Sequence, residues 1–226
     1  MRYWVVMPAA GIGRRFGAER PKQYAALCGR TVIEWALAPF LADRRCAGVM
    51  VALAAQDPYW GAVAPAGVQT TLGGAERSHS VRNALTALAG QAEATAWVLV
   101  HDAARPCLAA AELDRMIETL AEHPLGGLLA TPAADTLKRA DAAGCIEHTI
   151  DRTGLWRALT PQMFRYGMLC AALDRAHAAG RTPTDEAQAI EWCGERPQLV
   201  AGSAANLKIT SAADLTLAAA VLERNA

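Results

Sequence analysis

The chain has 226 residues, of which 53% are hydrophobic, and its 22 Lys and Arg residues balance 22 Asp and Glu residues. A chain of this length buries roughly 70% of its unfolded surface on folding, so we expect a single domain over residues 1–226 that needs no disulfides. The zero net charge argues against a nucleic-acid partner, because proteins of that class carry an excess of Lys and Arg that neutralises phosphates.

Short apolar runs alternate with amphipathic segments along the first 130 residues. The runs predict strands at 3–7, 49–53, 68–72, 97–100 and 127–130. Apolar residues at the i, i+3, i+4 spacing predict helices over 33–41, 81–89 and 113–121. This alternation predicts an α/β fold of the Rossmann-like, doubly wound type. Its sheet would be mostly parallel and would bind ligands at the carboxyl ends of the strands.

The alternation stops at residues 133–152, where the sequence is polar and turns around residues 141–144. This segment predicts a β-hairpin arm. A polar hairpin has too little apolar surface to be stable alone, so we expect it to project from the domain and pack on a second copy of the chain. The helical pattern then resumes, and Ser211 with Asp214 resembles a capping box that opens a last helix.

The strongest signal for chemistry follows the first predicted strand, in the segment PAAGIGRRFGAERPKQY from Pro8 to Tyr24. Glycines and small residues at this place let backbone N–H groups surround an anion, as in phosphate sites. Residues 11–30 contain five basic side chains and one acidic side chain, a local charge of +4. The segment therefore favours a small, highly charged ligand such as a triphosphate.

Two common phosphate loops do not fit this segment. A P-loop requires Gly-Lys followed by Ser or Thr, and the segment lacks that sequence. A dinucleotide-binding loop requires G-x-G-x-x-G, whereas Gly11, Gly13 and Gly17 have a different spacing. It also requires an acidic residue about 20 residues later, where this chain has Ala54, Ala55 and Gln56.

Four further segments lie after predicted strands or in the arm. Gly73 and Gly74 follow the third strand and would allow close approach to a planar base. The segment HDAARP at 101–106 follows the fourth strand and places the Asp102 carboxylate where it suits a hydrated Mg²⁺. The arm contains DTLKR at 135–139 and the pair Asp151-Arg152, and NLKIT at 206–210 predicts a short strand before the final helix.

The cysteines and histidines give mostly exclusions. Six scattered cysteines form no C-x-x-C pair, which argues against a zinc finger or a secreted disulfide framework and favours reduced thiols in the cytoplasm. The five histidines share no metal-ligand spacing, and we expect His101 to be structural. Pro8 and Gly11 interrupt the apolar start, so we expect no signal peptide. No apolar stretch approaches the roughly 20 residues of a membrane span, so we expect no membrane segment.

Taken together, these motifs closely resemble the 2-C-methyl-D-erythritol 4-phosphate cytidylyltransferase family of the non-mevalonate isoprenoid pathway. The resemblance runs from about Val5 to the final helix. Its motifs are PAAGxGxR with PKQ, GGxxRxxSV, HDAARP, DTxK, DR, TDE at 184–186 and NxKxT. The first motif alone indicates only the wider nucleotidyltransferase superfamily, whereas HDAARP with DTxK is more specific. One departure is Ala75, where some relatives are expected to have an acidic residue near the base.

The resemblance implies a cytidylyltransferase that transfers CMP from CTP to 2-C-methyl-D-erythritol 4-phosphate. The products would be 4-diphosphocytidyl-2-C-methyl-D-erythritol and pyrophosphate, formed by in-line attack on the α-phosphate. Because the attacking phosphate is already an anion, no strong general base is required, and catalysis depends on positioning and electrostatics. The resemblance also implies Mg²⁺ bound through the CTP phosphates, and a homodimer in which the arm reaches into the partner's site.

The resemblance assigns roles to individual residues. Arg15 and Lys22 would stabilise the transition state, and Asp102 would lie near the metal and the acceptor. The nucleotide would be bound by Pro8, Ala9, Ala10, Gly11, Gly13, Gly74, Ser80 and Ala103. The acceptor would be bound by Arg105, Thr136, Arg152 and Lys208. Thr136 and Arg152 belong to the arm and would act in trans.

The choice of lysine at three positions carries further information. Of the 22 basic residues 19 are Arg, and the three lysines are Lys22, Lys138 and Lys208. Two of these three lie at positions that the resemblance makes functional. An ammonium group is a compact charge, and a planar guanidinium cannot occupy the same space beside a phosphorus atom. We therefore predict that arginine cannot replace Lys22.

Two alternatives remain open on sequence grounds. A cytidylyltransferase for a pentitol phosphate such as ribitol 5-phosphate would share the first half of the chain. The segments around Thr136, Arg152 and Lys208 would then discriminate between the two acceptors. A nucleotide-binding regulatory or scaffold protein could keep the fold without turnover, but such a protein is expected to have lost Lys22 or Arg15, and both are present.

Overall fold

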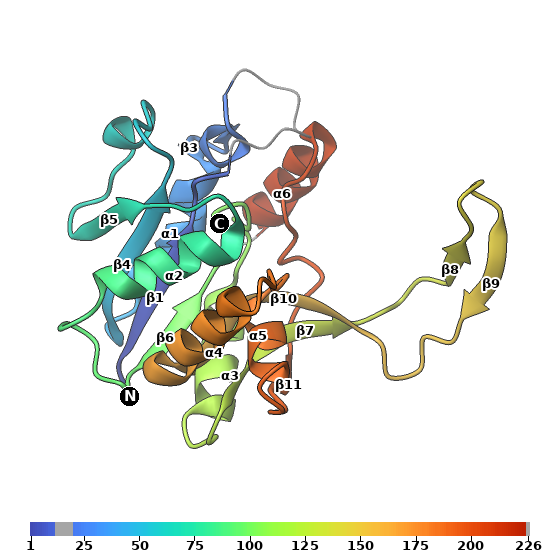
Figure 1. Cartoon of the computed structure of the whole chain (residues 1–226). Helices are drawn as coiled ribbons and strands as arrows, with labels where there is room; N and C mark the ends of the chain where they lie inside the picture. The colour runs from blue at the N-terminus through green and yellow to red at the C-terminus, as the bar shows by residue number, and fades with distance from the viewer. Residues whose placement is uncertain (12–19, 225–226) are drawn as a thin grey trace.

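A seven-stranded sheet runs through the centre of the protein, whose computed structural model describes residues 1–11 and 20–224 (Figure 1). Its strand order is β11-β7-β10-β6-β1-β4-β5. The strands are β1 (Tyr3–Pro8), β4 (Cys46–Leu53), β5 (Val68–Leu72), β6 (Trp97–Val100), β7 (Gly126–Pro132), β10 (Trp156–Arg165) and β11 (Gln198–Ala201). Six of these strands share one direction, and β10 is antiparallel to both of its neighbours. The prediction of a mostly parallel sheet in an α/β fold is therefore confirmed.

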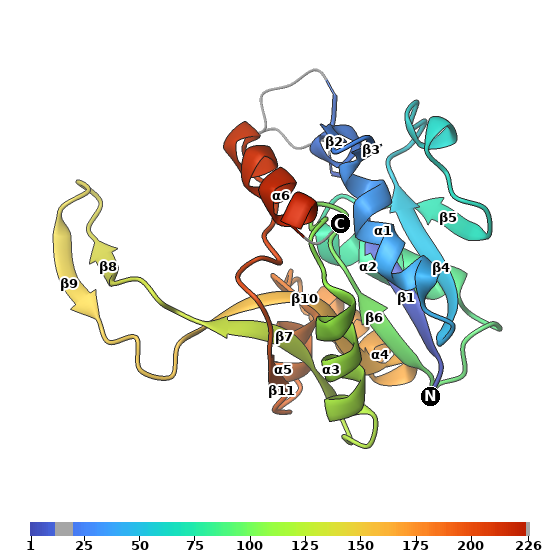
Figure 2. The same ribbon diagram turned by 180° about the vertical axis from the view of Figure 1, so that it is seen from behind.

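Helices cover both faces of the sheet (Figures 1 and 2). The helices are α1 (Val32–Ala42), α2 (Arg77–Ala87), α3 (Ala110–Leu120), α4 (Tyr166–Ala178), α5 (Glu186–Glu191) and α6 (Ala212–Arg224). Two 3₁₀ turns, η2 (Lys22–Tyr24) and η3 (Trp60–Ala62), and a small pair of strands, β2 (Ala26–Leu27) and β3 (Arg30–Thr31), complete the body. No helix in the described parts of the chain is long and apolar enough to cross a membrane.

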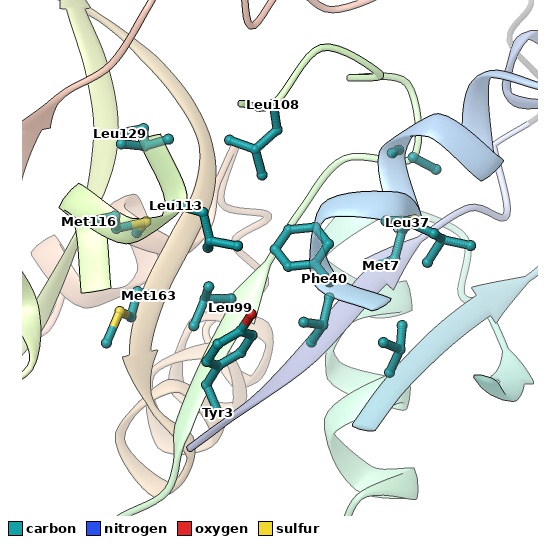
Figure 3. Packing of buried hydrophobic residues seen from close by; sticks show 14 of the residues in the cluster. Tyr3, Met7, Leu37, Phe40, Leu99, Leu108, Leu113, Met116, Leu129 and Met163 are labelled. Atoms are coloured by element: carbon teal, nitrogen blue, oxygen red, sulfur yellow. The ribbon is translucent and has the colours of Figure 1, made fainter. Parts of the chain in front are cut away.

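Successive side chains of β1 point to opposite faces of the sheet, and each face has its own hydrophobic core. Val5 and Met7 join a cluster with α1 and α3, in which Phe40 packs near Leu99 and Leu113 (Figure 3). Val6 points to the opposite face, into a cluster with α2, α4 and α5. This follows from the period of two in a strand. Because helices cover both faces, the buried strands are continuously apolar in sequence, and they were predictable for this reason.

The arm lies outside this body. Strands β8 (Leu137–Ala140) and β9 (Ile146–Ile150) form an antiparallel pair that extends away from the sheet (Figures 1 and 2). At the turn, Asp141 Oδ1 accepts hydrogen bonds from Ala143 N and Cys145 N, and Gly144 has a φ of +83° that favours glycine. Most arm side chains are exposed within one chain.

Two sequence expectations about strands differ from the structure. Strand β10 was not predicted, because Pro161 and a register shift between Ala158 and Gln162 interrupt its pattern. The strand expected at 206–210 is wrong. That segment pairs with no strand in the described part of the chain, and Ile209 N instead donates a single hydrogen bond to Ala104 O. The strand in this region is β11, at Gln198–Ala201.

Candidate functional site

A cavity of about 280 Å³ opens at the carboxyl ends of β1 and β6. Parallel strands end at the same edge of the sheet, so the loops that follow them meet there. The loop after β1, the start of α2, the loop after β6 and η2 all contribute. The lining residues are Pro8, Ala9, Ala10, Gly11, Lys22, Gln23, Gly74, Ala75, Glu76, Arg77, Ser80, Asp102, Ala103, Ala104 and Lys208.

The cavity gathers most of the residues for which a nucleotide role was predicted. Pro8, Ala9, Ala10, Gly11, Gly74, Ser80 and Ala103 all line it, together with Lys22 and Asp102. The predicted residues Gly13 and Arg15 lie outside the described residues. At Ala75, which departs from the family pattern, the cavity wall has no acidic side chain, but the neighbouring Glu76 lines the same cavity.

Internal packing accounts for the glycine pair after β5. A Cβ atom on Gly73 would overlap Ala10 Cβ, and one on Gly74 would overlap His79 Cβ. Gly74 N also donates to Ser80 Oγ over 3.0 Å. The glycines therefore let the loop after β1 and the start of α2 approach closely, a reason different from the contact with a base expected from the sequence.

Two polar side chains hold the cavity wall from η2. Gln23 Nε2 donates to Ala9 O over 2.8 Å and to Gly11 O over 3.1 Å, so it fixes the start of the glycine-rich loop. Lys22 Nζ donates to Ile209 O over 2.8 Å. This bond joins η2 to the segment that carries Lys208, and it places two ammonium groups on one wall of the cavity.

The buried carboxylate of Asp102 lies at the centre of a charge cluster. Its Oδ1 accepts from Arg77 Nε over 2.9 Å, and its Oδ2 lies 2.8 Å from Lys208 Nζ and 3.6 Å from Arg105 Nε. Burial alone would raise the pKa of Asp102, but Arg77, Lys208 and Arg105 outweigh burial and hold it well below its usual value. Arg77 also binds Glu186. Three cations against two carboxylates leave this cluster positive, which suits a phosphate ligand.

A smaller cavity of about 160 Å³ lies on the other side of this cluster. Arg77, Asp102 and Lys208 line both cavities, and Arg105 lines the smaller one. Arg105 is 8% exposed, and its Nη1 donates to Asn206 O over 2.7 Å. The structure thus brings two of the predicted acceptor residues, Arg105 and Lys208, to Asp102.

The other two predicted acceptor residues lie elsewhere in the chain. Thr136 and Arg152 flank the arm strands, are exposed, and line neither cavity in one chain. Their predicted role requires the arm of a second copy, and it stays a prediction.

Sequence reasoning gave no role to Arg77 and Glu186. Both belong to motifs that carried the resemblance, GGxxRxxSV and TDE. They are 109 residues apart, and no spacing pattern indicates that they form a pair. Only the packing of α2 and α5 on one face of the sheet reveals it.

His101 is a structural residue, in agreement with the sequence expectation. Its ring is fully buried, with Nδ1 2.9 Å from Thr160 Oγ1 and Nε2 3.0 Å from Arg105 O. The first contact ties the loop after β6 to β10, and the second lies within that loop. Burial lowers the pKa of His101 to about 4, so the ring is neutral at physiological pH.

This burial predicts a loss of stability at mildly acidic pH. The unfolded chain protonates His101 near pH 6.5 and the folded protein only near pH 4, so its contribution is complete above about pH 6.5 and declines toward pH 4. We expect His101 to account for about 2 kcal/mol of the decrease in unfolding free energy between pH 7 and about pH 4.5. Urea unfolding should show this component in the parent protein and not in His101→Gln. Equal pH slopes for the two proteins would contradict the prediction.

Comparisons with known proteins point to one family. The family model for 2-C-methyl-D-erythritol 4-phosphate cytidylyltransferase matches residues 3–224. A protein of that name from Halorhodospira halophila is 57% identical, over 98% of this chain and 94% of its own. Another, from Pseudomonas aeruginosa, is 55% identical, over 94% and 93% of the two chains.

Solved structures show the same likeness. A crystal structure of 4-diphosphocytidyl-2C-methyl-D-erythritol synthase has a TM-score of 0.86 at 38% identity and covers 98% of this chain and 99% of that one. The 2-C-methyl-D-erythritol 4-phosphate cytidylyltransferase of Francisella tularensis has a TM-score of 0.85 at 32% identity, covering 98% and 100%.

Proposed function

The chain belongs to the 2-C-methyl-D-erythritol 4-phosphate cytidylyltransferase family, and on this premise we propose that the cavity between β1, α2 and β6 is its active site. The enzyme transfers CMP from CTP to 2-C-methyl-D-erythritol 4-phosphate and releases pyrophosphate. The family match favours this acceptor over a pentitol phosphate such as ribitol 5-phosphate. The observation that supports this location is the cavity, because the glycine-rich loop after β1 lines it together with Lys22, Lys208 and Asp102.

The proposed mechanism is an in-line displacement at the α-phosphorus of CTP. An oxygen of the acceptor phosphate forms a bond to this phosphorus, and the bond from the phosphorus to the bridging oxygen breaks, so that pyrophosphate leaves with the electron pair. Because Pro8 has no N–H group and Ala9 N donates to Ala52 O over 2.8 Å, the backbone N–H groups of Ala10 and Gly11 bind the triphosphate. Lys22 stabilises the negative charge that grows on the α-phosphate, because an ammonium group already fixed in position needs little reorganisation.

The cations around Asp102 bring the second substrate to the first. Lys208 and Arg105 bind the acceptor phosphate, and Asp102 keeps these two side chains close together. Since two polyanions must approach each other, positive charge at this point lowers the barrier by positioning and charge neutralisation.

Mg²⁺ binds together with CTP in this proposal. Within residues 1–11 and 20–224, no group of three or more His, Cys, Asp and Glu side chains is placed to hold a metal ion. Asp102 lies nearby, but Arg77, Lys208 and Arg105 surround its oxygens, so the ion would be held by the phosphate oxygens of CTP and by water. When bound, the ion neutralises charge on the triphosphate.

Pyrophosphate release tests the proposed function directly. The purified protein is incubated with CTP and either 2-C-methyl-D-erythritol 4-phosphate or ribitol 5-phosphate, with Mg²⁺ or with EDTA. We expect release with the first acceptor and Mg²⁺ only. Release with ribitol 5-phosphate alone would establish the pentitol alternative, and tight CTP binding without release would establish a regulatory protein.

The arm supports the proposal of a homodimer. Large apolar side chains are exposed to water on and near the arm. They are Leu155 and Trp156 at its base and Ile146 on β9, with exposed fractions of 38%, 40% and 65%. With Leu199, residues at the base also line a surface depression of about 270 Å³. A second copy would cover these side chains and bring Thr136 and Arg152 to the partner's cavity. We place this dimer in the cytoplasm, in keeping with six free cysteines.

Mixing two inactive variants tests whether the arm acts in trans. An Arg152→Ala subunit keeps its cavity and loses its arm cation, whereas a Lys22→Ala subunit has the opposite defect. If the arm serves the partner, each mixed dimer has one intact site, and an equal mixture after subunit exchange should regain about a quarter of the parent activity. Sedimentation should show dimers throughout. Failure to regain activity in verified mixed dimers would assign Arg152 to its own chain's site.

A further inference from the structure

Glu186 is a buried carboxylate that reaches Asp102 through Arg77. It is the first residue of α5, its side chain is 1% exposed, and both of its oxygens accept hydrogen bonds from Arg77. The distances are 2.7 Å from Nη1 to Oε1 and 3.1 Å from Nη2 to Oε2. The pair joins α2 to α5, which cover the same face of the sheet (Figure 1).

The geometry of this pair determines where the rest of the Arg77 side chain points. A guanidinium is planar, so two parallel hydrogen bonds fix both its plane and its rotation. Its Nε–H then points to Asp102 Oδ1, over 2.9 Å. Asp102 Oδ2 is left to Lys208, at 2.8 Å. Glu186 therefore influences the site through two successive contacts, without touching either substrate.

Helix capping does not account for a carboxylate at this position. The N-cap of α5 is Asp185, whose Oδ1 accepts from Gln188 N over 2.9 Å. Ala187 N is bound by Gln162 Oε1 over 2.8 Å. Burial raises the pKa of Glu186, and the opposing effect of Arg77 does not cancel this rise, so the charge is costly to keep there. The role of the Glu186 charge is therefore to bind Arg77.

The charge count gives the consequence of losing Glu186. With Glu186, three cations face two carboxylates. Without its charge, Arg77 would be free to turn both of its terminal nitrogens toward Asp102 or toward a substrate phosphate. In the first case Arg77 would compete with Lys208 for Asp102, and in the second it would hold a substrate in the wrong place.

We infer that Glu186 is a positioning residue of the transferase: it holds Arg77 so that Arg77 orients Asp102, and Asp102 in turn holds Lys208 in place to bind the acceptor phosphate. This inference rests on the proposed function for the roles of Asp102 and Lys208. It concerns geometry within one chain and is independent of the arm.

Steady-state kinetics of Glu186→Gln test the inference, because this variant keeps the shape and removes the charge. We expect kcat/KM for 2-C-methyl-D-erythritol 4-phosphate to fall about 100-fold, the effect of displacing a site by about 1 Å. The KM for CTP should change less than about threefold, since backbone groups hold the triphosphate. Glu186→Asp keeps the charge and should recover at least part of the loss.

The matched control is Asp174→Asn. Asp174 accepts two hydrogen bonds of 2.6 and 2.9 Å from Arg82 on α2, the same kind of pair on the same helix. Its side chain is 56% exposed, and its partner Arg82 makes no ion pair with Asp102. Both kinetic constants should be unchanged in this variant. Equal kinetics for Glu186→Gln and Asp174→Asn would overturn the inference and leave Glu186 as a mere link between helices.

A crystal structure of Glu186→Gln separates this inference from the proposed function. We expect Arg77 Nε to move at least about 1 Å from Asp102 Oδ1. An unmoved Arg77 would overturn the inference whatever the kinetics. If the parent protein releases no pyrophosphate, the proposed reaction fails, and the position of Arg77 still decides whether Glu186 orients it.

Discussion

Replacing Lys22 by alanine should lower kcat about 150-fold, a loss of about 3 kcal/mol in transition-state stabilisation. The ammonium group lies in the cavity wall and is held by Ile209 O at 2.8 Å. In the proposed mechanism, removing it deletes a fixed donor beside the α-phosphorus. Pre-steady-state measurement of pyrophosphate release would separate this chemical effect from weaker binding of CTP.

Replacing Lys22 by arginine should cost nearly as much, although the positive charge remains. A guanidinium is longer and planar, so it cannot both keep the bond to Ile209 O and place a point charge at the same position. The matched control is Lys138→Arg, since Lys138 Nζ donates to Thr149 Oγ1 on the exposed surface of the arm. That variant should retain parent activity. Near-parent turnover by purified Lys22→Arg would refute the prediction.

Replacing Arg77 by methionine should have the largest effect on stability. Glu186 would keep a carboxylate that is 1% exposed and has lost both of its donors, and Asp102 would lose one of its three cations. Breaking a buried ion pair from one side costs about 3–5 kcal/mol. We expect a decrease of this size in the free energy of unfolding at pH 8, measured by urea denaturation.

The pH dependence of this decrease has a definite sign. Burial already raises the pKa of Glu186, and losing Arg77 raises it further. A carboxyl whose folded pKa is raised costs stability at high pH, and this cost shrinks as pH falls toward its unfolded value near 4.3. The difference between parent and variant should therefore be smaller at pH 5 than at pH 8.

A double variant separates the effect on stability of an unpaired Glu186 from the effect on activity of losing the contact between Arg77 and Asp102. Arg77→Met combined with Glu186→Met replaces both charges with apolar groups of similar volume, and such replacements are often neutral for stability. We expect most of the lost stability to return. Activity should stay low, because Asp102 would still lack its Arg77 contact. An Arg77→Met single variant as stable as the parent would show that the pair contributes little.

The fold of the first half was largely predictable from the sequence. The strands at 68–72 and 97–100 have the predicted bounds, and the others extend the predicted runs by one to three residues at an end. Parallel strands buried on both faces have continuous apolar runs, which leave a clear local signal. β10 escaped notice because Pro161 and a register shift break that signal. The wrong strand at 206–210 had the right residues for a strand but no partner strand to pair with along its length.

The candidate site was predictable in part for a similar reason. Pro8 to Gly11, Gly74, Asp102 and Lys208 each stand in a motif after an apolar run, and the topology of a parallel sheet gathers such segments at one edge. The structural role of individual residues could be predicted less well. Gly73 and Gly74 are required by contacts with Ala10 and His79, which no local pattern indicates.

The sequence by itself therefore determined the fold class, the edge of the sheet that holds the candidate site, and the family. These follow from periodicity and from the order of motifs along the chain. The tertiary structure alone decided how the charges pair. Although the net charge of the chain is zero, packing gathers a positive cluster in which Arg77 binds both Asp102 and Glu186. Arg77 and Glu186 are 109 residues apart in the sequence. Charges interact strongly only within a few ångströms and away from water, and those two conditions are set by packing and not by order along the chain.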